Sequence, residues 1–147
     1  MRERWWTAPA EGENGETVMV TGRDYLDKIR EGGKYHYLVR VSWDYEPGAG
    51  GMPSDRDAEL MEKATDALQA EFKKDPVAYM TGIYTGAGRR DWIFYTQSLG
   101  VFGKVFNRAL AELPEMPLKI EAEEDPGWEE YSQMREESYI PEGEEEG

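Results

Sequence analysis

Hydrophobic and polar residues alternate between positions 35 and 43, where every second side chain is aromatic or a valine. A period of two is typical of a strand with one buried face. The run 77–85 is also rich in strand-forming residues, and the run 91–95 contains four consecutive large apolar residues. An uninterrupted apolar run of this kind predicts a central strand that is covered on both faces.

Two later segments carry apolar residues at the three- and four-residue spacing of an amphipathic helix. The first begins at Ser54 and ends before Pro76, and the second begins at Ser98 and ends before Pro114. Both serines are good N-cap residues, because their hydroxyl oxygen can accept an unpaired N–H group of the first helical turn. A shorter helix is predicted directly after Asp125, with that aspartate as its cap and proline at its first position.

With an edge strand expected at 118–123, the order of elements is β-α-β-β-α-β, followed by a short C-terminal helix. This is the order of a ferredoxin-like antiparallel sheet with both helices on one face, so the predicted fold class is α+β. In that arrangement the strands at 35–43 and 91–95 lie in the middle. The opposite face then needs other apolar material, and the candidates are Trp5-Trp6 and Val18–Val20.

The same pattern divides the chain into three parts. Residues 35–134 are the predicted α+β core domain, and residues 1–34 are an N-terminal extension that packs on it. Residues 135–147 form an acidic tail that is too polar to bury a core, so we expect it to be disordered. Within the core, residues 86–90 (Gly-Ala-Gly-Arg-Arg) predict the loop of a β-hairpin.

The net charge of −14 is concentrated near the C-terminal end. Residues 112–147 contain 14 acids and 2 bases, a net charge of −12, whereas residues 1–111 are close to neutral. A local acidic segment of this kind keeps a protein soluble or binds a basic protein surface. It disfavours nucleic-acid binding, because the affinity for phosphate backbones depends on clustered lysine and arginine.

Several classes of chemistry are excluded or disfavoured by composition. The chain has no cysteine, so it has neither disulfides nor thiolate ligands or nucleophiles. No window has the length and apolarity of a membrane span, and the first residues do not read as a signal peptide. We therefore expect a cytoplasmic protein without a membrane partner.

Four residues are candidate ligand-binding residues. His36 is the single histidine, and Arg89 and Arg90 are the only basic pair beside the core hairpin, next to Trp92. Together they could hold a small anion on the face of the sheet. A lone histidine on a strand is more often a packing residue, so we assign no catalytic residue, no cofactor and no metal ligand.

Two glycine- and acid-rich features resemble known sites only superficially. The glycine-bearing tip at 86–88 leads into a strand and not into a helix, which indicates a turn and not a phosphate-binding loop. The acidic clusters at 121–125 and 144–146 do not have the spacing of a calcium-binding loop.

An RNA-recognition module has the same order of elements and displays aromatic residues on its first and third strands. Tyr37, Trp92 and Phe94 fall on the corresponding runs. The acidic composition and Asp91 weigh against base stacking, however, and burial in the core is the simpler interpretation. We therefore expect no nucleic acid as a partner.

Three motifs in order resemble a bacterial family, the domain of unknown function 695. They are Gly51-Met52-Pro53-Ser54-Asp55 at the start of a helix, the hairpin from Tyr84 to Tyr95, and the closing Asp125-Pro126-Gly127-Trp128-Glu129-Glu130-Tyr131. The resemblance spans about Tyr35 to Met134 and implies an α+β fold with no catalytic residues to transfer. At the level of fold alone, the arrangement is also similar to small acidic regulators that inhibit ribonuclease E by binding it.

The sequence therefore favours a non-enzymatic interaction or regulatory module whose acidic C-terminal region engages a basic protein surface. The alternative is an enzyme or a small-anion-binding protein that uses the sheet face with His36, Arg89 and Arg90. A homodimer formed through an uncovered aromatic sheet face is a further candidate assembly.

Overall fold

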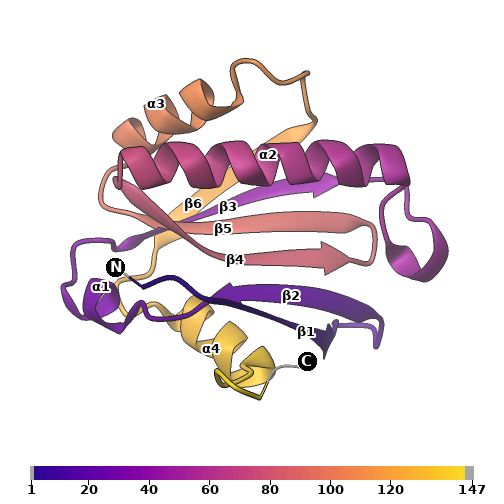
Figure 1. Cartoon of the computed structure of the whole chain (residues 1–147), viewed down its shortest axis with the longest axis horizontal. Helices are drawn as coiled ribbons and strands as arrows, with labels where there is room; N and C mark the ends of the chain where they lie inside the picture. Colours follow the sequence, from indigo (N-terminus) through magenta and orange to yellow (C-terminus); the bar gives the residue numbers. More distant parts are fainter. Residues whose placement is uncertain (1, 145–147) are drawn as a thin grey trace.

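A computed structural model describes residues 2–144, which adopt a mixed α+β architecture built on one sheet (Figure 1). All strand pairs are antiparallel, and the strand order is β1-β2-β4-β5-β3-β6. The elements in chain order are β1 (Trp5–Glu11), β2 (Thr17–Arg23), α1 (Asp27–Glu31), β3 (Tyr37–Asp44), the 3-10 turn η1 (Ala49–Gly51), α2 (Asp55–Lys74), β4 (Ala78–Gly86), β5 (Arg89–Thr96), α3 (Leu99–Leu110), β6 (Leu118–Glu124) and α4 (Glu129–Ser138).

The predicted α+β class is confirmed, and the sheet is larger than predicted. β3 and β5 are neighbours inside it, and β6 is an edge strand, as the sequence pattern indicates. The strand order differs from a four-stranded ferredoxin-like sheet because β1 and β2 extend it beyond β4. β1 was not predicted because Pro9 interrupts its strand-like sequence, although a proline is tolerated on an edge strand.

One face of the sheet is covered by α2 and α3 (Figure 1). Phe72 from α2 and Phe102 from α3 meet Phe94 of β5, with ring centroids 5.0–5.3 Å apart. All three side chains are at most 5% exposed. Each large apolar side chain buried in this way contributes about 1.5–3 kcal/mol, so this cluster holds both helices on the sheet.

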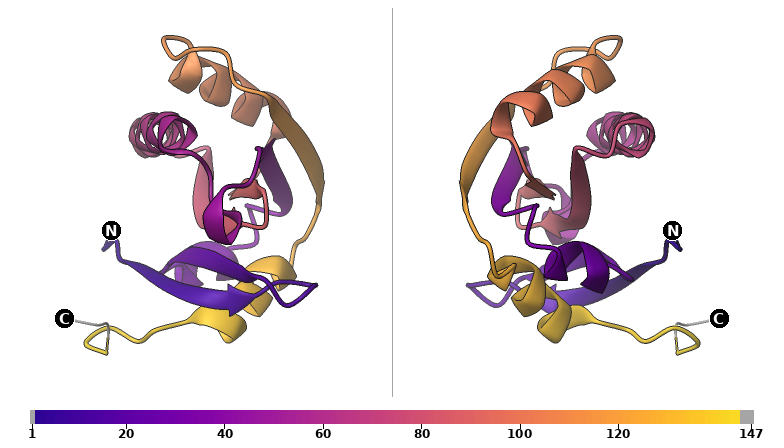
Figure 2. Two further views of the ribbon diagram at one scale, coloured as in Figure 1. Left: turned by 90° about the vertical axis from the view of Figure 1, so that its right-hand side faces the viewer. Right: turned by 90° about the vertical axis from the view of Figure 1, so that its left-hand side faces the viewer.

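The opposite face is covered by α4 (Figure 2), and the predicted N-terminal segments contribute Trp6 and Val20 to the same buried cluster. The segment around Val18–Val20 pairs with β4 and so extends the sheet sideways. From α4 and the turn before it, Trp128, Tyr131 and Met134 are buried against this face together with Trp6 of β1. Trp6 thus contributes to the cover, but the helix provides most of it.

The predicted caps of the two long helices are confirmed. The Ser54 hydroxyl accepts a hydrogen bond from the Asp57 N–H at 3.2 Å. The Ser98 hydroxyl accepts one from the Val101 N–H at 3.3 Å. Each cap pairs one of the amide groups that a helix leaves unpaired in its first turn.

α4 begins at Glu129, three residues later than the predicted start at proline 126. The Asp125 carboxylate still caps it, because it accepts the N–H groups of Glu129 at 2.9 Å and Glu130 at 3.1 Å. The same carboxylate accepts the hydroxyl of Tyr95 at 2.6 Å. Asp125 therefore ties the helix to the central strand β5, and its spacing from the helix start is set by Trp128, which has a positive φ of 55°.

The hairpin between β4 and β5 has a tighter turn than the predicted five-residue loop. Only Ala87 and Gly88 lie outside the strands, and both have positive φ (53° and 80°). Two central residues with positive φ are typical of the type I′ hairpin turn, which matches the twist of the flanking strands. Arg89 and Arg90, predicted to be loop residues, therefore belong to β5.

The C-terminal segment contacts the domain past the predicted boundary at 134. α4 continues to Ser138, whose hydroxyl accepts the Trp6 Nε1–H at 3.0 Å. Arg135 pairs with Asp24 at 3.0 Å. Residues 145–147 of the predicted disordered tail lie outside the described residues, and the division into three parts stays a prediction.

Candidate functional site

A cleft of about 750 Å³ lies beside α4, and we call it the acidic cleft. Its walls come from the β1–β2 turn, the strands β4, β5, β3 and β6, and α4. Acidic side chains dominate its lining, with two arginines among them. The charged lining residues are Glu11, Glu13, Glu16, Arg40, Arg89, Asp91, Glu121, Glu130 and Glu137.

A hydrogen-bonded chain of polar side chains forms the floor of the cleft. Arg40 on β3 pairs with Asp91 of β5 at 3.1 Å and with Glu130 of α4 at 3.3 Å. The hydroxyl of Tyr84 donates to Glu130 at 2.7 Å. The chain thus links three strands to the helix that covers them.

The second arginine of the cleft, Arg89, joins the same floor. Its Nε donates to Asp91 at 2.8 Å, and its Nη2 donates to the hydroxyl of Ser42 at 2.7 Å. The Ser42 hydroxyl in turn donates to Asp91 at 2.6 Å. Asp91 therefore receives hydrogen bonds from both arginines of the cleft, Arg40 and Arg89.

Strand periodicity explains why these residues meet. Ser42 lies opposite Asp91 in the β3–β5 register, and Arg40 lies two residues away on β3. Residues two apart on a strand share a face, so the polar positions of β3 face those of β5. By the same alternation, Arg90 and Trp92 point to the other face, toward α2.

Burial and charge shift the acid–base properties of the floor. Burial alone would lower the pKa of the Arg40 guanidinium, but the charges of Glu130 and Asp91 outweigh burial and raise that pKa. Burial raises the pKa of the Tyr84 hydroxyl, and the neighbouring Glu130 carboxylate raises it further. Arg40 is therefore a permanent cation, and Tyr84 stays a neutral hydrogen-bond donor.

The floor is close to neutral, whereas the rim is negative. Arg40 and Arg89 are balanced by Asp91 and Glu130, to which they are hydrogen-bonded or paired. The remaining five lining acids come from the end of β1, the β1–β2 turn, β6 and α4. None of these five has an ion-pair partner among residues 2–144. An occupant of the cleft therefore meets an uncompensated negative field.

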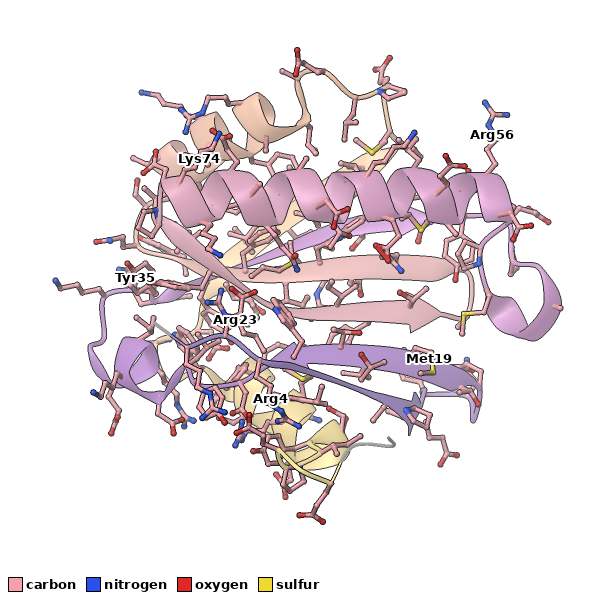
Figure 3. All side chains as sticks on the ribbon, in the orientation of Figure 1. Arg4, Met19, Arg23, Tyr35, Arg56 and Lys74 are labelled. Carbon is pink, nitrogen blue, oxygen red and sulfur yellow. The ribbon has the colours of Figure 1, made fainter. Side chains whose placement is uncertain are left out.

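A second concave region, which we call the α2-side groove, lies on the opposite face of the sheet. It has a volume of about 620 Å³ and runs between α2 and the strands β1, β2 and β4. Arg90 lines it. Met19 on β2, labelled in Figure 3, belongs to the wall opposite α2.

The four candidate residues from the sequence do not converge on one site. His36 precedes β3 at the end of the sheet away from the β4–β5 turn, and its ring lies 4.3 Å from that of Tyr37. Arg89 lines the acidic cleft, whereas Arg90 lies on the opposite face with Trp92, 5.7 Å from its ring centroid. The four candidate residues therefore lie in three separate places: His36 at one end of the sheet, Arg89 on the α4 face, and Arg90 with Trp92 on the α2 face.

Two of the three aromatic residues considered for base stacking, Trp92 and Phe94, are covered by the helices of the α2 face, whereas Tyr37 is half-buried. Trp92 is 1% exposed and Phe94 is 0% exposed. The Trp92 Nε1–H donates to the Thr65 hydroxyl of α2 at 2.9 Å. These two side chains are therefore core residues, and they offer no surface on which a base could stack.

Sequence reasoning missed Arg40, Tyr84 and Glu130 as residues of a site. Arg40 was visible as one of the polar positions of an alternating strand, and Glu130 lies in the closing motif of the family resemblance. Only the packing of α4 on the sheet brings them within hydrogen-bonding distance of one another. The acids of the β1–β2 turn gave no signal at all, because β1 itself was not predicted.

Among residues 2–144, no group of three or more histidine, aspartate or glutamate side chains is arranged to hold a metal ion. No helix in that range combines the length and apolarity needed to cross a lipid bilayer.

Comparisons with known proteins place the chain in a family but give no activity. The search of curated proteins and the search of solved structures found no match. The model of the family of unknown function DUF695 matches residues 5–134, which include β1, β2 and all three motifs. The chain therefore belongs to the DUF695 family, whose function is unknown.

Proposed function

We propose that this protein is a non-enzymatic interaction module that binds a basic segment of another protein in the acidic cleft. The observation that supports this most is the surplus of carboxylates at the cleft, where both arginines are already paired with acids. A lysine- or arginine-rich chain would supply the missing positive charge. The cleft is also concave, so it can enclose part of a bound chain, which a flat acidic surface cannot do.

The acids of the rim come from distant parts of the sequence. Glu121 and Glu137 belong to the acidic C-terminal region, whereas Glu11 ends β1 and Glu13 and Glu16 lie in the β1–β2 turn. Convergence of exposed charges on one concavity is what distinguishes a binding surface from a merely solubilising one. Such a surface accelerates association and gives selectivity for cationic partners.

Titration with an oligolysine peptide, followed by NMR of the full chain, tests the proposal. We expect chemical-shift changes concentrated on residues 11–16, on 84–91 and on α4, and an affinity that falls as salt is added, because exposed charges are screened within about 8–10 Å at physiological salt. Shift changes spread evenly over every acidic residue would contradict a defined site.

Two charge-matched triple variants make the test sharper. Glu11→Gln, Glu13→Gln and Glu121→Gln remove three exposed rim acids, and we expect them to weaken oligolysine binding clearly. The control is Glu31→Gln, Glu46→Gln and Glu112→Gln, which removes the same charge at exposed positions outside the cleft. Equal losses in the two variants would mean that net charge, and not the cleft, governs binding.

Substitution is preferable to truncation of the acidic C-terminal region. Removal of the chain from Glu136 onward would delete Ser138, which is bonded to Trp6, and Tyr139, whose ring packs on that of Trp6 at 5.0 Å. A truncated chain would therefore lose packing together with charge. Exposed Glu→Gln changes leave both intact.

We also keep three finer statements as proposals: a bacterial origin, a cytoplasmic location, and a ferredoxin-like arrangement of the four strands β4, β5, β3 and β6. The neighbour order of those strands supports the third, since β3 and β5 are in the middle. A homodimer has less support. The aromatic sheet face that motivated it is covered by Trp128 and Tyr131.

A further inference from the structure

Arg90 lines the α2-side groove and has no counter-ion in the part of the chain that the structure describes. Its Nε donates to the Thr85 hydroxyl at 2.9 Å, and its guanidinium lies over the Trp92 ring at 5.7 Å. Within residues 2–144, no carboxylate lies at ion-pair distance from it. A guanidinium has five N–H donors, so most of the donors of Arg90 are left for a partner that the chain does not supply.

The surroundings make this unpaired charge costly. Arg90 is only partly exposed, and burial lowers the pKa of its guanidinium, although the more distant charge of Glu62 opposes the shift. A cation in such a place is stabilised when an anion with matching geometry reaches it. A carboxylate matches a guanidinium through two parallel hydrogen bonds, which gives both strength and orientation.

Two carboxylates without a counter-ion line the same groove on its helical side. Glu62 and Asp66 are four residues apart on α2, so they share one face of the helix. Neither has an ion-pair partner among the described residues, and both are exposed. Like charges at this spacing repel each other mildly, and a cation bound between them would remove the repulsion.

Between these opposite charges the groove has apolar walls. Trp5 of β1, Met19 of β2 and Ile83 of β4 line it, and threonine side chains lie among them. The volume of about 620 Å³ is in the ordinary range for small-molecule sites, which are mostly apolar with a few placed polar groups. A third lining carboxylate, Glu3, already pairs with Arg23 at 3.8 Å and accepts the Trp5 Nε1–H at 2.8 Å. The groove thus presents one cation, two carboxylates without an ion-pair partner among residues 2–144, and an apolar wall.

We propose that the α2-side groove binds a small zwitterion with an apolar side chain, namely a free α-amino acid. The ligand carboxylate pairs with Arg90, its ammonium group lies near Glu62 and Asp66, and its side chain packs against Trp5 and Met19. A simple anion is disfavoured because the acids outnumber the arginine. A simple cation leaves Arg90 without a partner.

Isothermal titration of the full chain with three related probes tests this proposal. L-Phenylalanine carries both charges, 3-phenylpropionate lacks the ammonium group, and phenethylamine lacks the carboxylate. We expect L-phenylalanine to bind. Each analogue should bind at least about tenfold more weakly, as expected when a charged hydrogen bond is lost. No binding of L-phenylalanine to the folded chain, or equal affinity for 3-phenylpropionate, would overturn the proposal.

Matched variants locate the binding. Arg90→Gln is expected to weaken L-phenylalanine binding about tenfold or more. Arg89→Gln, which removes the same charge one residue away on the opposite face, is expected to leave it unchanged. Glu62→Gln is an exposed helix substitution that leaves the core intact, and it should weaken the binding of L-phenylalanine but not of 3-phenylpropionate. Equal effects of Arg89→Gln and Arg90→Gln would refute the assignment to this groove.

Discussion

The α2 face and the α4 face of the sheet are both closed by helices, yet different interactions close them. On the α2 face, phenylalanine rings from two helices and one strand pack together, and Trp92 in the same cluster donates to the neutral hydroxyl of Thr65 at 2.9 Å. On the α4 face, the buried aromatic residues also form hydrogen bonds: Trp128 donates to the Tyr35 carbonyl at 2.7 Å, and Tyr95 donates to Asp125 at 2.6 Å. The α4 face therefore depends on geometry and charge, where the α2 face depends mainly on apolar area.

This difference extends to the two concave regions. The acidic cleft beside α4 has a floor in which every arginine is paired, so its character is set by the exposed acids around it. The α2-side groove has an arginine, Arg90, that no carboxylate of residues 2–144 pairs with, and it lies beside apolar walls. Two consecutive residues of one strand, Arg89 and Arg90, therefore serve two chemically different surfaces.

Removal of one large side chain from each face gives the largest expected effect. Phe94→Ala on the α2 face and Trp128→Ala on the α4 face should each lower the free energy of unfolding by about 3–5 kcal/mol, because each residue is at most 1% exposed. Urea unfolding followed by far-UV circular dichroism measures both. A single shifted transition is expected in each case. A separate early transition for Trp128→Ala alone would show that the α4 layer unfolds independently.

Substitution of Asp24 tests how much the ion pairs on the α4 side contribute to the free energy of unfolding. Its carboxylate pairs with Arg4 at 2.8 Å and with Arg135 at 3.0 Å. Burial alone would raise the pKa of the Asp24 carboxyl, but hydrogen bonds from the Tyr25 N–H, Arg135, Arg4 and Tyr139 outweigh burial and lower it. Asp24→Asn should therefore lower the free energy of unfolding at neutral pH by about 1–3 kcal/mol.

The sign of the pH dependence follows from the same shift. Because the folded-state pKa of Asp24 lies below the unfolded value of about 3.9, its contribution is complete above that value and is lost as the pH falls through the folded-state pKa. Denaturant unfolding between pH 7 and pH 3 should thus show that the free energy of unfolding falls below about pH 4. This fall should be smaller in Asp24→Asn. Phe94→Ala is the control, and its destabilisation should be independent of pH. A pH profile that Asp24→Asn leaves unchanged would contradict this role.

A close approach on the α4 side provides a third test. A Cβ atom at Gly22 of β2 would lie 2.2 Å from the ring of Trp6. Gly22→Ala must therefore displace a tryptophan that is 1% exposed, and we expect a loss of about 1–3 kcal/mol in the free energy of unfolding. Thermal unfolding monitored by tryptophan fluorescence would report both the loss and the altered Trp6 environment. Unchanged stability would show that Trp6 can move without cost.

The smallest expected effect is a gain on the α2 face. Gly103 lies inside α3, and a Cβ atom there would meet no atom within 4 Å. Gly103→Ala should raise the free energy of unfolding by about 0.5–1 kcal/mol, because alanine loses less backbone entropy than glycine in a helix. The same glycine-to-alanine change thus has opposite signs at positions 22 and 103. A loss at 103 would mean that α3 packs more closely than its surroundings indicate.

An element was predicted correctly where neighbouring residues in the sequence determine it, and less well where they do not. Ser54 and Ser98 were placed correctly because a cap acts within one helical turn, so sequence neighbours contain all the information. The start of α4 was misplaced because Asp125 can reach the first N–H groups from four residues away when Trp128 takes a positive φ. The hairpin turn was placed correctly but was predicted too long, since glycine marks a turn without fixing its length.

The candidate site was less predictable than the fold. Arg90 and Trp92 lie together because residues two apart on a strand share a face, and Arg89 lies on the opposite face for the same reason. The partners of Arg40 lie 51 and 90 positions away along the chain, on β5 and α4. No local pattern encodes contacts at such separations.

The sequence by itself determined the α+β class, the central place of β3 and β5, the edge position of β6 and the concentration of acid after residue 111. These features follow from periodicity and composition, which are local properties of a chain. Only the tertiary structure decided that β1 and β2 would extend the sheet, that α4 would cover the face opposite α2, and that acids of the β1–β2 turn would join those of the C-terminal region. Those outcomes depend on which surfaces bury the most apolar area when they pack together. That buried area is set by contacts between segments that are distant in the sequence, so it is known only from the packed chain.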